Sequence, residues 1–200
     1  MKATRTSAPG LYGIGYDIIH KFRTALIPAL VAGLQFSWRH SRSLATRNTG
    51  AMKRLYKRGN HHPTTELPIC LQNGVFKIYA SILSKRLARW KSANDRFCLS
   101  QIGFHDIDGC HEHNFVSSML IDHARRNRDS LCIVWYDLRN AFGSVPTDLI
   151  WQTMTAIGVP GMFIDRWRDI YHNSFNAIIN AADGQSDPIR HQVGVYHGRP

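Results

Sequence analysis

The stretch Leu131-Cys132-Ile133-Val134-Trp135-Tyr136-Asp137 is a continuous apolar run that ends in a carboxylate. Short, continuous apolar runs are typical of strands that are buried on both faces of a sheet. The sequence therefore predicts a buried strand over residues 131–136, with Asp137 at its end. A carboxylate in that place can be held rigidly against a cleft and bind a divalent metal such as magnesium. Asp also commonly caps the turn after a strand, so spacing alone leaves both interpretations open.

Helical spacing of apolar residues precedes and follows this run. The predicted helices cover about residues 16–38, 73–90, 112–126, 146–157 and 162–172. Pro28 is expected to kink or divide the first of them, and Gly158 to end the fourth. Residues 60–68 are rich in turn-forming types and predict a loop.

Two further strands are predicted near the end of the sequence, over residues 175–181 and 188–195. Asp183-Gly184 lies between them and favours a tight turn. In this interpretation the helices come first and the strands later, which favours an α+β fold over a doubly wound sheet.

The charge balance points to a polyanionic partner. The chain has 25 Lys and Arg against 14 Asp and Glu, a formal net charge of +11. Residues 1–60 contain eleven of these cations and one acid, Asp17, so this segment carries 11 − 1 = +10. Clustered positive charge binds phosphate backbones by releasing their counterions. A basic segment without a nucleic-acid partner is the alternative.

The cysteine and apolar patterns indicate an intracellular protein, nuclear or cytoplasmic. The four cysteines have no paired spacing, which is typical of a reducing compartment. The longest apolar run, residues 24–34, is eleven residues long and contains Pro28, whereas a membrane span needs about 20. No signal peptide is expected. Residues 110–113, Cys-His-Glu-His, lack the two spaced ligand pairs of structural zinc, so no zinc is expected either.

The stretch that begins at Tyr136 carries a family resemblance. Tyr136-Asp137-Leu138-Arg139-Asn140-Ala141-Phe142, followed by Ser144-Val145-Pro146, resembles the first palm motif of the reverse transcriptases of LINE-type (non-LTR) retrotransposons. The resemblance implies that Asp137 is shared by two catalytic metal ions, magnesium in the intact enzymes, and that the backbone carbonyl of Leu138 helps to hold one. Phe142 is similar to the aromatic gate that excludes a 2′-hydroxyl by steric clash.

Five further segments resemble motifs of the same family and follow in the same order. They are residues 7–14 (the opening Pro-Gly-x-Asp-Gly-Ile), 55–59 (a fingers strand), 67–71 (Arg-Pro-Ile-Ser-Leu), 100–104 (Gln-x-Gly-Phe) and 194–200 (Gly-Val-Arg-Gln-Gly-Cys-Pro). A maturase-like enzyme is a weaker alternative, because the regions around Gln101 and Phe142 are more similar to LINE elements.

By this resemblance the chain is an incomplete right-hand polymerase, with about residues 1–129 mostly fingers and about 130–200 the start of the palm. The implied reaction is RNA-templated transfer of a nucleotide to a DNA primer. The resemblance assigns Lys57, Phe142, His197 and Gly198 to the nucleotide. Arg54, Arg58 and Gln101 are the residues expected to contact nucleic acid.

The departures from the family pattern occur at positions that have functional roles in the family. Leu67 replaces the arginine before Pro68, and an alkyl chain cannot supply a bidentate cation. Tyr12 replaces an aspartate. Tyr196-His197-Gly198-Arg199 replaces Arg-Gln-Gly-Cys, and His197 does not repeat the contacts of a glutamine amide.

The second metal motif of the family, aromatic-Ala-Asp-Asp, is expected beyond Pro200, as is the thumb, and the sequence contains no Asp-Asp pair. A two-metal displacement needs more carboxylates than Asp137 alone. We therefore expect a polymerase fragment that is inactive by itself. The alternatives are a non-catalytic, basic nucleic-acid-binding protein and a non-functional remnant of a transposable element.

Overall fold

The computed structural model describes residues 8–40, 49–56, 66–96, 98, 100–103, 109–138, 140–173, 176–181, 184–190 and 194–195. The chain divides into two compact units. The first unit comprises Met1–Ala88 and Asn140–Pro200, and the second comprises Arg89–Arg139. Each unit is described by itself.

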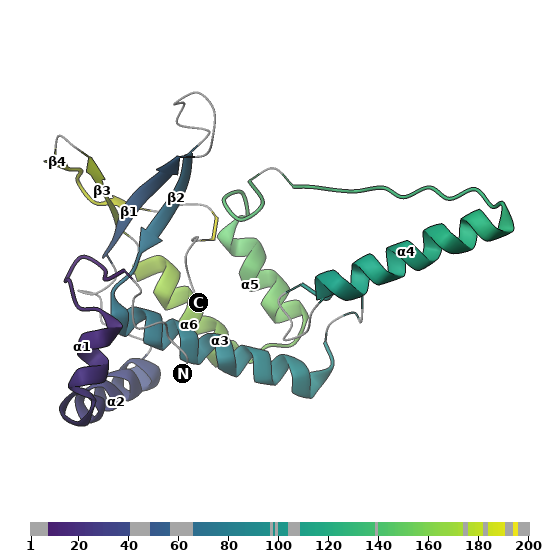
Figure 1. Cartoon of the computed structure of the whole chain (residues 1–200). Coiled ribbons are helices and arrows are strands. Elements are labelled where there is room, and N and C mark those ends of the chain that lie inside the picture. The colour runs from purple at the N-terminus through teal and green to yellow at the C-terminus, as the bar shows by residue number, and fades with distance from the viewer. Residues whose placement is uncertain are drawn as a thin grey trace. The chain divides into compact units, whose positions relative to one another are not determined.

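Helices and strands occur in blocks along the chain: two helices, two strands, four helices and three short strands among the described residues (Figure 1). The order is α1 (Tyr16–Lys21), α2 (Arg23–His40), β1 (Thr49–Tyr56), β2 (Glu66–Leu71), α3 (Gly74–Asn94), α4 (Gly109–Asn127), α5 (Thr147–Ala156), α6 (Gly161–Asn173), β3 (Asn176–Ala181), β4 (Gly184–Gln185) and β5 (Ile189–Arg190). An α+β fold is compatible with this order. The expectation that strands follow helices was wrong, because β1 and β2 precede α3.

The sheet of the first unit joins early and late strands. Its order is β2-β1-β3-β4, and β5 also pairs with β3. β1 is antiparallel to β2 and parallel to β3, with Thr49 opposite Asn176 and Met52 opposite Ile179. The predicted strand over residues 175–181 is confirmed as β3. Of the predicted strand over residues 188–195 only the two residues of β5 are strand in the described part, and the two-residue β4, which begins at the predicted turn, was not predicted.

The loop predicted over residues 60–68 extends too far, because β2 begins at Glu66. Pro68 lies within this strand, opposite Arg54 of β1. Proline lacks the N–H that a central strand must donate, but an edge strand leaves one side unpaired. Among the described strands β2 is at an edge of the sheet, which explains why Pro68 is tolerated there.

The first helical stretch breaks at Phe22 rather than at the predicted Pro28. Pro28 lies inside α2, near its beginning. At that position proline removes a single hydrogen bond, the one to the carbonyl of Thr24, and its fixed φ still fits a helix. Of the kink or division predicted at Pro28, the division was therefore wrong, and the kink stays a prediction.

The core of the first unit lies where α3 meets α6, β2 and α2. Leu83 and Ile170 are fully buried at its centre. The cluster contains Cys70, Phe76, Tyr79, Ala80, Leu83 and Ile170, with Leu34, Trp38, Phe163, Trp167 and Tyr171 packed against it. The apolar residues of α6 recur at helical spacing and so face this cluster together.

The helices predicted around residues 73–90, 146–157 and 162–172 are confirmed as α3, α5 and α6. Gly158 ends α5 with φ 85°, and Val159 donates to the carbonyl of Met154 at 2.9 Å. Gly158 itself donates to Thr155 at 3.0 Å. This is the pattern of a Schellman cap, in which glycine adopts the left-handed conformation at little cost.

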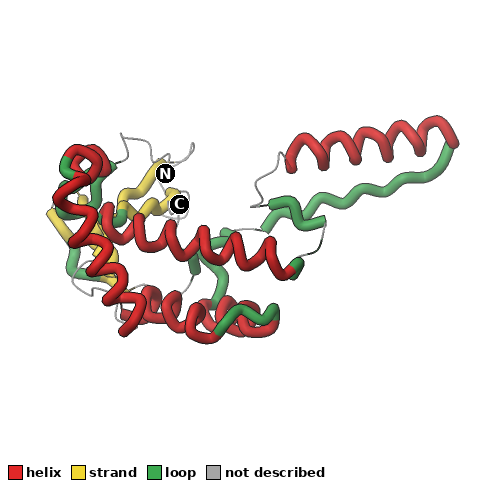
Figure 2. The backbone as a smooth tube through the Cα atoms, turned by 90° about the horizontal axis from the view of Figure 1, so that it is seen from below, coloured by secondary structure: helices red, strands yellow, loops and turns green. Residues whose placement is uncertain are grey.

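In the second unit the predicted strand over residues 131–136 does not form. The predicted helix before it is confirmed as α4, after which the chain runs as an extended segment without strand partners among the described residues (Figures 1 and 2). Trp135 is 78% exposed and Tyr136 90%. An apolar run becomes a buried strand only when neighbouring strands accept its backbone groups and cover its faces. No described strand does this here.

Candidate nucleotide-binding site

A tight turn presents Phe142. Residues 141–144 form the turn, and the amide of Ser144 donates to the carbonyl of Asn140 at 3.0 Å. Asn140 has φ 52°, a left-handed conformation that asparagine tolerates better than most residues. The Phe142 side chain is 46% exposed, so a large part of its ring is open to solvent.

A second segment docks on this turn. The amide of Gly194 donates to the carbonyl of Val145 at 2.9 Å, and the amide of Val195 donates to the carbonyl of Phe142 at 2.6 Å. Gly194 is buried with φ 96°, and a Cβ added there would lie 2.7–2.8 Å from backbone atoms of Gly143. Only glycine permits this approach. The structure therefore brings together the turn of Phe142 and the beginning of the segment that contains His197 and Gly198.

Asp137 and Leu138 belong to the other unit. Both side chains are exposed, at the end of the extended segment described above. Among the residues that the structure describes, no three His, Cys, Asp or Glu side chains gather in a way that could hold a metal ion. The described residues therefore do not fit a magnesium pair, and no catalytic step through metal ions follows from this geometry.

Gln101 lies in an exposed turn of the second unit. Its amide donates to the carbonyl of Cys98 at 2.9 Å. Ser100 donates hydrogen bonds to Cys98 from its backbone and from its side chain, and these lower the pKa of the Cys98 thiol below its usual value. The side-chain amide of Gln101 lies 3.5 Å from the carbonyl oxygen of Gly103 and is open to solvent.

The lowered pKa gives Cys98 more thiolate at neutral pH than an ordinary exposed cysteine has. We expect iodoacetamide to modify Cys98 several-fold faster than Cys110 and Cys132, which are also exposed, at about pH 7.5. Mass spectrometry of the alkylated peptides measures the three rates across pH. The alkylation rate of Cys98 should begin to rise at a lower pH than the rates of Cys110 and Cys132. Ser100→Ala should make the Cys98 rate more similar to the other two. Identical pH profiles for the three thiols would contradict this expectation.

Several predicted site residues are not placed. Lys57, Arg58, His197 and Gly198 lie outside the described residues. The backbone of Arg54 is in β1, opposite Pro68, and its side chain is outside the described part.

The segment that resembles the opening motif packs at the start of α3. Lys77 donates from Nζ to the carbonyl oxygen of Ala8 at 3.1 Å, and burial lowers the pKa of its ammonium group. The amide nitrogen of Tyr12 lies 3.5 Å from the side-chain oxygen of Asn73. A Cβ on Gly10 would lie 2.7 Å from the Asn73 nitrogen, so glycine is required for this close packing. The segment that resembles the opening motif therefore contacts the beginning of α3.

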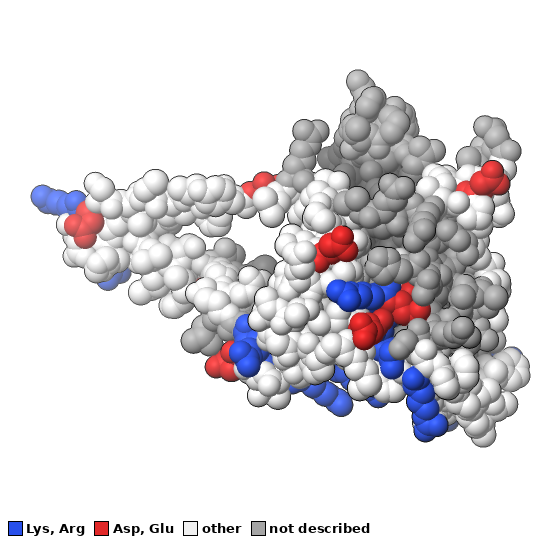
Figure 3. Space-filling model, turned by 180° about the vertical axis from the view of Figure 1, so that it is seen from behind, with Lys and Arg blue, Asp and Glu red and all other residues white. Residues whose placement is uncertain are grey.

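Basic residues are frequent in α3, whose last residues, from Arg89 on, belong to the second unit. Figure 3 shows Lys and Arg side chains, with a few Asp and Glu side chains among them, on the face that it draws. The sequence of α3 contains Lys77, Lys85, Arg86, Arg89 and Lys91 and no acidic residue. Such a helix attracts anionic partners.

Comparison with known protein families assigns the chain to one of them. The family model described as reverse transcriptase (RNA-dependent DNA polymerase) matches residues 56–194. This match covers more than half of the chain and includes the Phe142 turn and Gly194. The protein belongs to the reverse transcriptase family. No curated protein matches it. In the described part of the chain, no helix is long and apolar enough to cross a membrane.

Sequence reasoning missed the residues that build the Phe142 turn. The left-handed Asn140 and the pairing of Gly194 and Val195 with that turn were not predicted. The signals were present, since Asn140 and Gly143 flank Ala-Phe, and asparagine and glycine favour turns. Which distant segment docks on a turn is not readable from local pattern, because the contact joins residues about fifty positions apart.

Proposed function

We propose that this chain is the fingers and the first part of the palm of a reverse transcriptase from a LINE-type (non-LTR) retrotransposon. In this proposal residues 1–129 are mostly fingers, and the palm begins near residue 130. The substrates are an RNA template, a DNA primer and deoxynucleoside triphosphates. The family match supports RNA-directed DNA polymerase chemistry. The LINE subtype is supported by the ordered motifs along the sequence.

The observation that carries the proposal is the docking of Gly194 and Val195 on the turn of Phe142. Two segments that resemble nucleotide-contacting motifs are joined by backbone hydrogen bonds at 2.6 and 2.9 Å. We propose that Phe142 packs against the sugar of the incoming nucleotide, and that His197 and Gly198 follow the docked segment to the nucleotide and template. A partly exposed ring held on a rigid turn can exclude one additional hydroxyl by steric clash.

We propose that Asp137, with the Leu138 carbonyl beside it, would contribute one carboxylate to a magnesium site that the described residues do not complete. When bound, such ions stabilise the charge that develops on the transferring phosphate. The described residues supply no second group of carboxylates, and the sequence contains no Asp-Asp pair. We therefore propose that these 200 residues alone do not extend a primer.

The triphosphate contact is the point at which this chain departs from the motif. Leu67 stands where the family pattern has arginine, and it lies opposite Leu55 in the β1–β2 ladder. Arg54 is the neighbour of Leu55 and faces Pro68. We propose that Arg54 and Lys57 provide the cations on this hairpin. Together with Arg58 and Gln101 they contact the template backbone or the nucleotide.

A poly(rA)·oligo(dT) hybrid tests the proposal. We expect the chain to bind it with an affinity that falls steeply between about 50 and 200 mM salt, because binding releases counterions. Replacing Arg54, Lys57 and Arg58 by glutamine should lower the slope of log K against log salt by about one for each phosphate that the variant no longer neutralises. Fluorescence anisotropy measures both the affinity and the slope. With dTTP and Mg²⁺ the primer should not be extended.

The matched control removes three cations elsewhere, by replacing Arg125, Arg126 and Arg168 with glutamine. It has the same net charge as the first variant and should retain most of the slope. If the two variants lose equal amounts of affinity and salt slope, binding depends on net charge alone and not on the cations of the β1–β2 hairpin. Primer extension by these 200 residues would overturn the proposed inactivity.

The subtype has a separate test. Sequencing the transcript past the codon for Pro200 should show a frame that continues into an aromatic-Ala-Asp-Asp motif. A frame that continues into an unrelated domain would remove the support for a LINE-type polymerase.

Nucleic-acid binding without catalysis is a second candidate function. The charge of 11 − 1 = +10 over residues 1–60 favours it, because phosphate binding needs no catalytic carboxylates. Salt-dependent binding of the hybrid by a protein whose transcript stops directly after Pro200 would select it. A failure to bind at low salt would instead indicate a remnant without function.

A further inference from the structure

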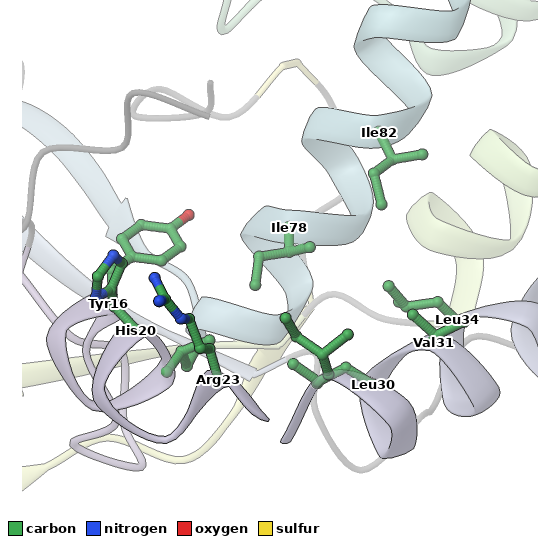
Figure 4. Close-up of a pocket in the computed structure, with 10 residues that line it drawn as sticks. Tyr16, His20, Arg23, Leu30, Val31, Leu34, Ile78 and Ile82 are labelled. Atoms are coloured by element: carbon green, nitrogen blue, oxygen red, sulfur yellow. The ribbon is translucent and has the colours of Figure 1, made fainter. Parts of the chain in front are cut away.

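An apolar groove runs between α2 and α3 in the first unit. It consists of two adjoining cavities of about 360 and 370 Å³, which share Val31, Leu34 and Ile82. Figure 4 shows the first cavity, in which Ile78 and Ile82 of α3 point toward Leu30, Val31 and Leu34 of α2. Cavities of this size accept large apolar side chains.

The walls of this α2–α3 groove are open to solvent. Val31 is 46% exposed, Ile27 is 50% exposed and Ile82 is 36% exposed. Their side chains lie in a row along two helices, whereas isolated exposed apolar residues are scattered on an ordinary surface. A continuous apolar surface of this kind marks an interaction site.

Cationic and aromatic groups close both ends of the groove. At one end His20 and Arg23 lie beside Tyr16, whose phenol has a pKa raised by burial. At the other end are Arg39 and Arg86, and the Arg86 guanidinium lies 4.6 Å from the centre of the Trp38 ring. Neither α2 nor α3 contains an acidic residue, and Asp17, the acidic residue of α1, is not among the residues that line the groove. The groove is thus apolar in its floor and positive at its ends.

We propose that the α2–α3 groove binds an acidic amphipathic helix of a partner protein. An amphipathic helix places apolar side chains at positions i, i+3, i+4 and i+7 on one face, the arrangement that two adjoining apolar cavities accept. Carboxylates near its two ends then meet Arg23 and Arg39, which are 39 − 23 = 16 positions apart. That separation is about 24 Å, the length of a helix of about 16 residues.

The floor of the groove distinguishes this partner from nucleic acid. Single-stranded bases are bound by stacking on aromatic rings. Here the residues shared by the two cavities are aliphatic, the aromatic rings Tyr16 and Trp38 lie toward the ends, and Tyr79 is buried in the core. Aliphatic pockets with a positive rim instead match leucine side chains with flanking glutamates.

A fluorescent peptide of about 16 residues, with leucine at i, i+3, i+4 and i+7 and glutamate at both ends, is the probe. The full chain should bind it with saturable anisotropy, and a scrambled peptide of the same composition should bind at least about tenfold more weakly. Val31→Gln combined with Ile82→Gln should also weaken binding about tenfold, because polar amides then line the shared wall. Both side chains are partly exposed, so the fold tolerates the change.

Two control variants test the surface specifically. Phe36→Gln changes an exposed apolar residue of α2 that lines neither cavity, and it should bind the peptide as the native chain does. Arg39→Glu should weaken binding more than Lys85→Glu, since Lys85 lies outside the groove. The proposal is overturned if the native and scrambled peptides bind equally, or if Phe36→Gln matches the double variant. It is also overturned if a single-stranded RNA binds with a dependence on Val31 and Ile82 while the peptide does not.

Discussion

Replacing Leu83 by alanine should lower the free energy of unfolding by roughly 3–5 kcal/mol, the cost of removing a fully buried leucine side chain. Leu83 is 0% exposed and lies among Phe76, Tyr79 and Ile170, where α3 meets α6. The substitution removes apolar packing and leaves a cavity between two helices that can move together only in part. Urea unfolding followed by far-UV circular dichroism measures this decrease in stability.

Leu149→Ala is the matched control for Leu83→Ala. It removes the same atoms from a leucine of α5 that is exposed, so the decrease should stay below about 1 kcal/mol. Equal decreases at the two positions would show that α3 and α6 do not form the core described above. A change in the slope of the urea transition would indicate an effect on the unfolded chain instead.

Gly194→Ala should separate the two segments of the candidate nucleotide site. With φ 96° the alanine is strained by about 1–3 kcal/mol. Its Cβ would also lie 2.7–2.8 Å from the backbone of Gly143, which cannot yield as a flexible side chain can. Hydrogen exchange of the Val195 amide, which donates to the Phe142 carbonyl at 2.6 Å, reports the docking directly. We expect this amide to lose most of its protection.

The control for Gly194→Ala is Gly158→Ala. Gly158 has φ 85°, and a Cβ there meets nothing within 4 Å. This variant therefore carries the cost of the left-handed backbone without the clash. It should lose less stability than Gly194→Ala and leave the exchange of the Val195 amide unchanged. Loss of Val195 protection in both variants would mean that global unfolding, rather than local undocking, exposes that amide.

Periodic elements of this protein are predictable from sequence because their signals are local. Apolar residues from Phe76 to Trp90 recur at helical spacing, and α3 forms there. Pro146 and Gly158 bound α5 for reasons of backbone chemistry that act within a few residues. These effects do not depend on the rest of the fold.

The predicted strand over residues 131–136 shows where local reasoning ends. Its apolar composition is typical of a buried strand, but burial requires neighbours that no local pattern specifies. The described part of the chain supplies none, and the segment stays exposed. Pro28 illustrates the reverse case, in which a strong local breaker is tolerated near the beginning of a longer helix.

The candidate site also has a part that could be predicted from sequence and a part that could not. Phe142 was identified from its motif, and the structure places it on an exposed turn. Its pairing with Gly194 and Val195 required the structure, because the hydrogen bonds join two segments that are remote in sequence. The roles of Phe142, Asp137, Lys57 and His197 all remain predictions.

The parallel pairing of β1 with β3 affects how the protein folds during its synthesis on the ribosome. Thr49 pairs with Asn176, so after Thr49 is synthesised a further 176 − 49 = 127 residues must be added before its partner in β3 exists. At about 5–20 residues per second this interval lasts about 6–25 s. During that time one edge of the β1–β2 hairpin is an uncovered template for pairing with other nascent chains. We expect the hairpin to be the part of the nascent polypeptide that chaperones shield.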